Sequence, residues 1–487
     1  MKQILCILLS VLGWTTGMTQ NPYQIKGKVD CENKGIHGVV VSDGKNCVQT
    51  DEQGNYSLDI DNESQFVFIS TPAGYLTEVK ENTIPLFYEP IDRSSDKKYD
   101  FHLKKNPHDD LNHVFFAQAD VQAISSENLD TYHTFQNDYL EQLAAYPNTD
   151  IFGIDCGDIT SDNAQLFPPY IEAVKTLNIP IYRAIGNHDM DYNGRSFETS
   201  HHSFESYFGP TCYSFNKGKM HYIVINNNFY IGREFYYIGY IDEKTFQWIE
   251  KDLSFLEKGS PLVIVMHIPT RLTEKQQPFQ FDYNTLADQT VNAEAFHQLI
   301  QDHPTHIISG HMHYNLNICY NDRLMEHNTA AICGTWWCSD ICLDGTPRGY
   351  GIYQVNGNQL TWKYKCIGKP DNYQARVYLP GASQEYPQAI IANVWNWDEQ
   401  WKVEWMEDGK VMGEMTQFTA FDPLAEKICN KAVQTYSWIA PVKTNHLFKA
   451  IPKNPQAQIS VKITDRFGHE YLQPAEDFSS TLLQLNN

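Results

Sequence analysis

The chain has 487 residues, which is too long for one compact core and predicts two to four domains. Hydrophobic residues make up 42% and aromatic residues 13% of it, as in folded globular proteins. Lys and Arg number 37 against 59 Asp and Glu, for a formal net charge of -22, and basic residues form no block, so we expect neither nucleic acids nor anionic membrane surfaces as partners.

Residues 1–20 have the order of a secretory signal peptide. Lys2 precedes an apolar stretch from Ile4 to about Leu12, after which small and polar residues follow. The stretch is short for a bilayer span, and the alternative is a buried N-terminal strand. Because no later segment has about 18 uninterrupted apolar residues, we predict a periplasmic or secreted protein without a membrane span.

The cysteine content is compatible with disulfides in an oxidising compartment. Of 11 cysteines, Cys6 lies in the predicted signal peptide, which leaves an even number. The local candidates for pairing are Cys31 with Cys47, or two among Cys333, Cys338 and Cys342. Connectivity does not follow from the sequence, and each cysteine can equally be a buried free thiol.

Residues 21–107 show the pattern of a small β-sandwich. Apolar and polar residues alternate in short runs, which are broken by turn residues. The stretch GVVVSDGKNCVQTDEQGNYSLDI resembles the carboxypeptidase-regulatory-like β-domains that often precede secreted enzymes. We therefore expect this segment to serve in spacing or docking.

Residues 108–365 alternate apolar strands with helical stretches such as SENLDTYHTFQNDYLEQLAAY, which is typical of an α/β architecture. Five apolar runs stop at side chains that can bind metal: Asp120, Asp158, Asn187 with His188, His267, and His311 with His313. Each one alone is explained as a helix cap, a turn residue or a structural histidine. Their recurrence at strand ends, where ligands bind in open α/β sheets, indicates one shared site.

Residues 366–487 return to strands and predict a C-terminal β-rich domain. The run VWNWDEQWKVEW alternates like a strand with one tryptophan-rich face. Stripes at period two usually face a core, so this pattern favours core packing over a carbohydrate-binding platform.

The order of the central motifs resembles the calcineurin-like metallophosphoesterase family: D-x-Q, GDITSD, GNHD, a His after a strand, and GHMH. GNHD at 186–189 together with GHMH at 310–313 is the specific part, and the resemblance covers about half of the chain. It implies a central four-layer α/β/β/α sandwich between the two β-domains. The flanks and CGTWWCSDICLDGTPRGYGIY at 333–353 resemble a bacterial secreted subgroup of this family.

The resemblance implies a site for two divalent metal ions and a hydroxide nucleophile that they generate. Asp158 would bridge the ions, with Asp120, Gln122 and His313 on one ion and Asn187, His267 and His311 on the other. The set contains no thiolate, which suits Mn, Fe or Zn without choosing among them. Gln122 stands where most of the family has His, and its amide oxygen predicts a site weaker for Zn than for Mn or Fe.

His188 is similar to the family's general acid, and a structural histidine is the alternative. Asp162 or Asp189 is expected to orient it, although GDITSD departs by one residue from the better-known GDxxDR pattern. The Arg of the protein Ser/Thr phosphatase branch is absent, because Asn163 follows Asp162. Arg183 is expected to be structural, and a close match to that branch is not expected.

The predicted function is hydrolysis of small-molecule or phosphoprotein phosphate esters, with no prediction of oligomeric state. The alternatives are a phosphodiesterase rather than a phosphomonoesterase, or a non-catalytic secreted protein that binds glycans or proteins. The residues that are predicted either to rim the pocket or to pack in a core are His201, His202, Trp336 and Trp337.

Overall fold

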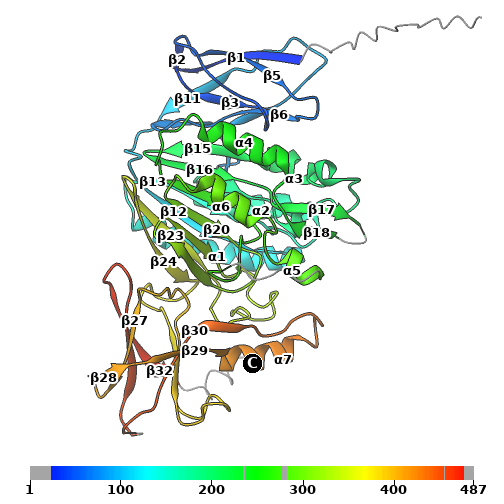
Figure 1. The fold of residues 1–487 in the computed structure, drawn as a ribbon. Coiled ribbons are helices and arrows are strands. Elements are labelled where there is room, and N and C mark those ends of the chain that lie inside the picture. Colours follow the sequence, from blue (N-terminus) through cyan, green and yellow to red (C-terminus); the bar gives the residue numbers. More distant parts are fainter. Residues whose placement is uncertain (1–22, 234–235, 276–281, 455, 477–487) are drawn as a thin grey trace, which may run out of the picture.

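The structure of the protein, a computed structural model, describes residues 23–233, 236–275, 282–454 and 456–476. The predicted signal peptide therefore lies outside the described residues. Three units follow one another along the chain, and the N-terminal and C-terminal units lie at opposite ends of the central one (Figure 1). Within the described residues, no helix combines the length and the apolar character needed to cross a membrane.

The N-terminal unit is the predicted β-sandwich. Its strands are β1 (Tyr23–Cys31), β2 (Lys34–Gly35), β3 (Val40–Ser42), β4 (Cys47–Gln49), β5 (Asn55–Ile60), β6 (Phe66–Ile69), β7 (Tyr75–Leu76), β8 (Val79–Lys80), β9 (Ile84–Pro85), β10 (Tyr88–Pro90) and β11 (Phe101–Lys105). One sheet has the order β2-β1-β11-β7 with β5 beside β1, and the other has the order β10-β6-β3-β4. On β5 every second residue is buried, as the alternating sequence predicts.

Two sheets form the centre of the central unit. The first contains β12 (Asn112–Gln118), β13 (Asp150–Asp155), β14 (Ile181–Arg183), β23 (Gly349–Asn356) and β24 (Gln359–Cys366), in the order β14-β13-β12-β23-β24. The second contains β15 (Tyr213–Lys217), β16 (Met220–Val224), β19 (Leu262–Val265), β20 (Thr305–Ser309), β21 (Leu316–Asn321) and β22 (Leu324–Asn328), in the order β15-β16-β19-β20-β22-β21. Strands β12, β13 and β14 run parallel, as do β16, β19, β20 and β22.

Helices cover the outer faces of these two sheets (Figure 1). They are α1 (Ser126–Ala144), α2 (Phe167–Val174), α3 (His202–Phe208), α4 (Glu243–Leu253), α5 (Tyr283–Ala287) and α6 (Ala293–Ile300), with the 3-10 helices η1 (Ala164–Leu166), η2 (Lys175–Leu177), η3 (Asn187–Asp189) and η4 (Phe197–Thr199) and the hairpin β17 (Asn228–Gly232) to β18 (Tyr236–Gly239). On β12, Phe115 packs between the sheets while Phe116 packs toward α1, so both faces of the strand are buried. This explains its unbroken apolar sequence, and the α/β/β/α sandwich is confirmed.

The C-terminal unit is a single large sheet with one helix. Its elements are β25 (Arg376–Tyr378), β26 (Ile390–Asn393), β27 (Lys402–Glu407), β28 (Lys410–Glu414), β29 (Thr416–Phe421), α7 (Pro423–Ala432), β30 (Lys443–Ala450), β31 (Ile459–Thr464) and β32 (Glu470–Glu476), with the strand order β28-β27-β31-β32-β25-β26-β30-β29. Trp401 and Trp405 are buried with Val403 in its core. The prediction of core packing for this tryptophan-rich face is therefore confirmed.

The ten cysteines within the described residues are free thiols. The candidate pairing of Cys31 with Cys47, and any pairing among Cys333, Cys338 and Cys342, is therefore not formed. Cys31 and Cys47 are buried, which agrees with the alternative that they are small hydrophobic residues.

Candidate metal centre

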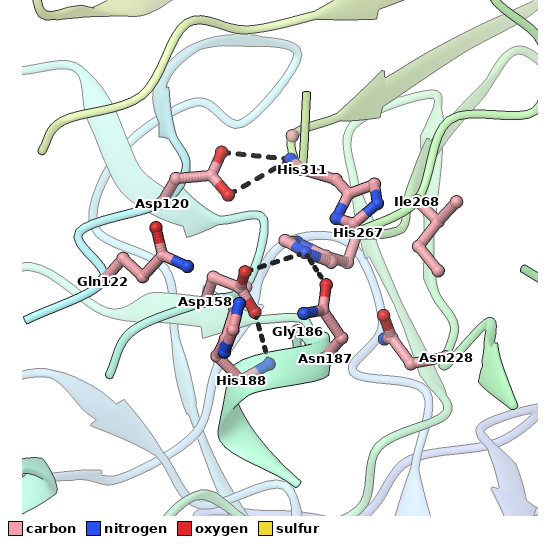
Figure 2. Close-up of polar contacts among 12 residues, drawn as sticks. Asp120, Gln122, Asp158, Gly186, Asn187, His188, Asn228, His267, Ile268 and His311 are labelled. Atoms are coloured by element: carbon pink, nitrogen blue, oxygen red, sulfur yellow. Dashed lines mark hydrogen bonds and ion pairs between the residues drawn. The ribbon is translucent and has the colours of Figure 1, made fainter. Parts of the chain in front are cut away.

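The predicted metal-binding residues follow strands of both central sheets. Asp120 follows β12, Asp158 follows β13, Asn187 begins η3 after β14, His267 follows β19, and His311 and His313 follow β20. Parallel strands present their carboxyl ends at one edge of a sheet, so these side chains meet there. Figure 2 shows side chains from both sheets directed toward one another.

The backbone of these loops is held in a conformation that side chains rarely adopt. The φ angle is positive at five of the predicted ligands: Asp120 (56°), Gln122 (39°), Asp158 (52°), His311 (73°) and His313 (55°). Each such residue costs on the order of 1 kcal/mol or more, and such strain clusters at functional sites. The loops also brace each other, because the Asp120 amide donates to the Gly157 carbonyl at 3.0 Å and the Gln122 amide to the Asp158 carbonyl at 2.7 Å.

One group of side chains surrounds Asp120 and His313. Asp120 Oδ1 lies 3.6 Å from His313 Nε2, and both oxygens of Asp120 accept from the His311 amide, at 3.2 and 3.0 Å. The Cys333 thiol lies 3.7 Å from His313 Nδ1 and 3.8 Å from Gln122 Oε1. Gln122 and His313 therefore share a neighbour that the motif pattern did not assign to the site, although the CGTWW segment contains it.

A second group surrounds His267, whose protonation pattern follows from its contacts. Nδ1 lies 2.8 Å from the Cys156 carbonyl, which can only accept, so Nδ1 carries a hydrogen. Nε2 then faces Asn187 Oδ1 at 3.0 Å and Asp158 Oδ2 at 3.2 Å (Figure 2). His311 completes this group, since ligand atoms of Asp158, His267 and His311 lie within 4.8 Å of one another.

The charges of the site fit divalent cations. Asp120 and Asp158 are 0% and 1% exposed, and within the described residues neither forms an ion pair with Lys or Arg. Burial, with the nearby Asp158 charge, raises the pKa of Asp120 well above its usual range. Burial lowers the pKa of His313 to about 3, which leaves its ring neutral and able to bind a metal. The oxygen and nitrogen donors suit two divalent ions.

Two opposing effects set the pKa of His267. Burial lowers the pKa of His267, but the Asp158 and Asp120 carboxylates raise it further, to about 9. An imidazole held protonated between carboxylates is a site where a metal ion displaces the proton.

His188 lies at the rim of the site and is paired with Asp162. Its Nδ1 is 2.9 Å from Asp162 Oδ1, and the two side chains are 31% and 51% exposed. Asp189 instead accepts the backbone amides of Ile159, Thr160 and Gly186 at 3.0 to 3.1 Å. Of the two candidates for orienting His188, Asp162 is the one in contact.

Arg183 supports the scaffold from below the site. It is 3% exposed, and its guanidinium donates to the Thr83 carbonyl at 3.3 Å and to Thr83 Oγ1 at 2.8 Å. The same guanidinium donates to the Ile181 carbonyl at 2.9 Å. Its expected structural role is confirmed.

The four aromatic and imidazole residues that were candidates for the rim divide into two sets. Trp336 stacks on the His313 ring at 4.2 Å between centroids, and Trp337 Nε1 donates to the Val121 and Gln122 carbonyls at 3.1 and 3.3 Å. His201 instead lines a hollow of about 280 Å³ against the N-terminal sandwich, among Phe66, Phe68 and Phe197, and His202 begins α3 with its side chain exposed. Of the two alternatives for His201, packing away from the metal site is the one observed, and α3 itself packs through Phe204 and Phe208 against Phe167 of α2.

A residue of the C-terminal unit helps to hold the loop that contains His313. Asp344 is fully buried, and its Oδ2 accepts from the Asn315 amide and lies 3.0 Å from His446 Nε2 on β30. The Leu343 amide donates to the His313 carbonyl at 3.2 Å. A histidine of the C-terminal sheet therefore fixes a loop that contains a predicted ligand.

Three family profiles match the chain. They are described as the N terminal of Calcineurin-like phosphoesterase over residues 23–106, Calcineurin-like phosphoesterase over residues 85–315, and the C terminal of Calcineurin-like phosphoesterase over residues 326–471. The third profile begins inside β22, so it includes strands of the central sheet as well as the C-terminal unit. A search of curated proteins gives no significant match.

Solved structures of phosphatases show a distant resemblance. A dimetal phosphatase from Danio rerio is 14% identical, covers 53% of this chain and 97% of its own, and has a TM-score of 0.39. A purple acid phosphatase from yellow lupin (Lupinus luteus) is 13% identical over 69% of this chain and 68% of its own, also with a TM-score of 0.39. A 5'-nucleotidase from Candida albicans is 12% identical over 54% of this chain and 52% of its own, with a TM-score of 0.31.

Gly186→Ala is expected to abolish metal binding while the protein stays folded. An added Cβ would lie 2.1 Å from both the amide nitrogen and Oδ1 of Asp158, so that carboxylate must move. Overpacking of this kind costs roughly 1–3 kcal/mol, and elemental analysis of the purified variant should show less bound metal. Gly357→Ala is the control for backbone strain alone, because its added Cβ meets nothing within 4 Å although its φ of 66° makes alanine strained there. Equal metal content in wild type and Gly186→Ala would contradict the prediction.

His446 lies in the C-terminal unit, and His446→Ala is nevertheless expected to weaken metal binding at the central site. The change removes a partner of the buried Asp344 carboxylate, which should lower the free energy of unfolding by about 1–3 kcal/mol and loosen the His313 loop. Chemical denaturation and metal titration measure the two effects. His469→Ala is the control, since this side chain is 66% exposed beside Asp465 and should change stability by less than about 1 kcal/mol. If His446→Ala binds metal as tightly as wild type, the C-terminal unit does not support the metal site.

Proposed function

Since the chain belongs to the calcineurin-like phosphoesterase family, we propose that its strand-end side chains hold two divalent ions and that the enzyme hydrolyses phosphate esters there. Asp158 would be shared, with Asp120, Gln122 and His313 toward one ion and Asn187, His267 and His311 toward the other. When bound, the ions acidify a water molecule and neutralise charge on the phosphoryl oxygens. Mn, Fe and Zn are all compatible with this donor set.

The observation that supports this proposal most is the convergence of donors around His267 Nε2. His267 Nε2 lies 3.0 Å from Asn187 Oδ1 and 3.2 Å from Asp158 Oδ2, so three atoms that can each bind a cation meet at one point. Such a cluster is costly to bury unless a cation or proton compensates it. The alternative of a non-catalytic binding protein gives no reason to keep it, and the tryptophan-rich face that would bind glycans is core.

We assign the general-acid role to His188. Its Nδ1 faces the Asp162 carboxylate, which can only accept, so Nδ1 carries a hydrogen and Nε2 is left as the proton donor. Burial lowers the pKa of His188, but Asp158 and Asp162 raise it further, to about 9, which favours the imidazolium at neutral pH. As the bond between phosphorus and the leaving oxygen breaks, the proton on Nε2 passes to that oxygen.

Two aspects of the proposal extend beyond the site. These donors serve hydrolysis of monoesters and diesters alike, so a comparison of p-nitrophenyl phosphate with bis-p-nitrophenyl phosphate separates the two activities.

The N-terminal order of charge and apolar residues supports export, and we propose a periplasmic or secreted enzyme.

His188→Ala is expected to reduce kcat most for esters with poor leaving groups. An alkyl alcohol needs a proton to leave, so the loss should be roughly 100-fold or more, whereas p-nitrophenolate leaves without one and should lose much less. Assays with Mn, Fe or Zn measure both, and Asp162→Asn should show the same pattern more weakly. Asp158→Ala is the reference, because losing a shared ligand should abolish both reactions. If Asp158→Ala and His188→Ala both matched wild type, the proposed mechanism would fail.

Gln122→His is expected to shift metal preference toward Zn. Replacing an amide oxygen with an imidazole nitrogen softens the donor, so Zn affinity should rise relative to Mn by roughly tenfold or more. Competition titrations followed by elemental analysis measure the ratio. Unchanged preference and occupancy would show that Gln122 does not bind metal.

A further inference from the structure

Four tyrosines form a continuous surface beside the metal centre, which we name the tyrosine wall: Tyr192, Tyr236, Tyr237 and Tyr283. Tyr192 follows η3, Tyr236 and Tyr237 begin β18, and Tyr283 begins α5, which lies beside β18 (Figure 1). Ring centroids are 5.5 Å apart for Tyr192 and Tyr236, 6.5 Å for Tyr236 and Tyr283, and 6.2 Å for Tyr237 and Tyr283. Three separate segments therefore contribute to one aromatic surface.

The inner end of the wall touches the predicted ligands. The Tyr192 hydroxyl donates to the Asn187 carbonyl at 2.9 Å, and the Tyr237 ring lies edge-on to the His311 ring at 6.0 Å. The Tyr230 hydroxyl donates to the Tyr192 carbonyl at 2.8 Å, which fixes that segment against β17. Two of the four rings are thus positioned by direct contact with residues of the second metal group.

The outer end of the wall is open to solvent. Tyr236 is 51% exposed and Tyr283 is 43% exposed, whereas Tyr237 behind them is 8% exposed. Tyr236 also has a φ of 59°, which is strained for a bulky side chain and is found mainly where function requires it. Core packing explains Tyr237, but it does not explain two large exposed rings in contact with each other.

The wall lies on the same side of the site as the proton donor. The Tyr192 hydroxyl donates to the carbonyl of Asn187, which directly precedes His188 in η3, so Tyr192 lies against the segment that carries the proton donor. A leaving group must lie near the acid that protonates it. The leaving group is therefore the part of the substrate that the wall can reach.

We propose that the tyrosine wall binds the leaving group of the ester, and that this group contains a planar aromatic ring. This inference rests on the proposed function of the metal centre and names its substrate class. Aromatic side chains attract another ring in offset or edge-on arrangements, and the wall carries no charge with which to hold the phosphate itself. An aryl alcohol and a nucleoside share this chemistry.

Matched substrate pairs test the proposal. Benzyl phosphate and cyclohexylmethyl phosphate have similar size and leaving-group reactivity but differ in aromaticity, while adenosine 5'-monophosphate and ribose 5-phosphate share an ester linkage and differ by the base. Wild type should have a higher kcat/KM for the aromatic member of at least one pair. Preference within the first pair indicates an aryl ligand, and preference within the second indicates a nucleobase.

Tyr236→Ala with Tyr283→Ala should lower kcat/KM for the aromatic substrate on the order of tenfold and change its saturated partner by less than about twofold. Tyr236→Phe with Tyr283→Phe keeps both rings and should stay close to wild type. Trp438→Ala is the control for an exposed aromatic side chain elsewhere, since Trp438 is 61% exposed in the C-terminal unit.

Different results would contradict the hydrolytic function of the metal centre and the role of the tyrosine wall. If wild type with Mn, Fe or Zn hydrolyses none of the four esters, the proposed function is contradicted. If it hydrolyses them but the alanine pair lowers both members of each pair equally, or neither, the tyrosine wall is not the leaving-group site and the metal centre stands.

Discussion

The structure depends on one electrostatic constraint, which is the burial of two carboxylates that, among the described residues, form no ion pair with Lys or Arg. Asp120 and Asp158 sit at the ends of neighbouring parallel strands, and their surroundings supply imidazoles, amides and backbone N–H groups. Such charges are costly to bury unless a cation or a proton compensates them. The strained loops, the fixed orientation of His267 and the glycine contacts all follow from holding these two groups close together.

Meeting that constraint engages all three units of the chain. On the N-terminal side, Thr83 accepts hydrogen bonds from the guanidinium of Arg183 on β14. Asn187 follows this strand, and Asp158 follows its neighbour β13. From the C-terminal side, His446 contacts the carboxylate that anchors the His313 loop. A buried polar network of this kind is stabilising only when every member is satisfied, so the flanking sheets contribute to the chemistry although they hold none of the proposed ligands.

The fold and the cluster of strand-end side chains were predictable because both follow from short, local sequence patterns. A buried strand has an apolar sequence, and the polar residue just after that run can be identified from its position, as Asp120 and His267 were. Other features depend on how distant segments pack. The sequence left a rim position and packing open for His201, and only the structure shows that it lines a hollow with Phe66 and Phe68. Neither the contact of Cys333 with Gln122 nor the meeting of β18 with α5 follows from spacing, because each joins segments far apart in the sequence.

The close packing around Gly186 and the openness of Tyr236 and Tyr283 divide the site into two parts with different tolerance for change. At Gly186 even a methyl group collides with the shared carboxylate, so the ligand loops accept almost no variation. The exposed rings lie on a hairpin and a short helix at the surface, where substitutions are tolerated more readily than beside the ligands. Relatives built on this plan can therefore exchange one class of alcohol for another by replacing a few surface residues, while the inherited hydrolytic machinery stays the same.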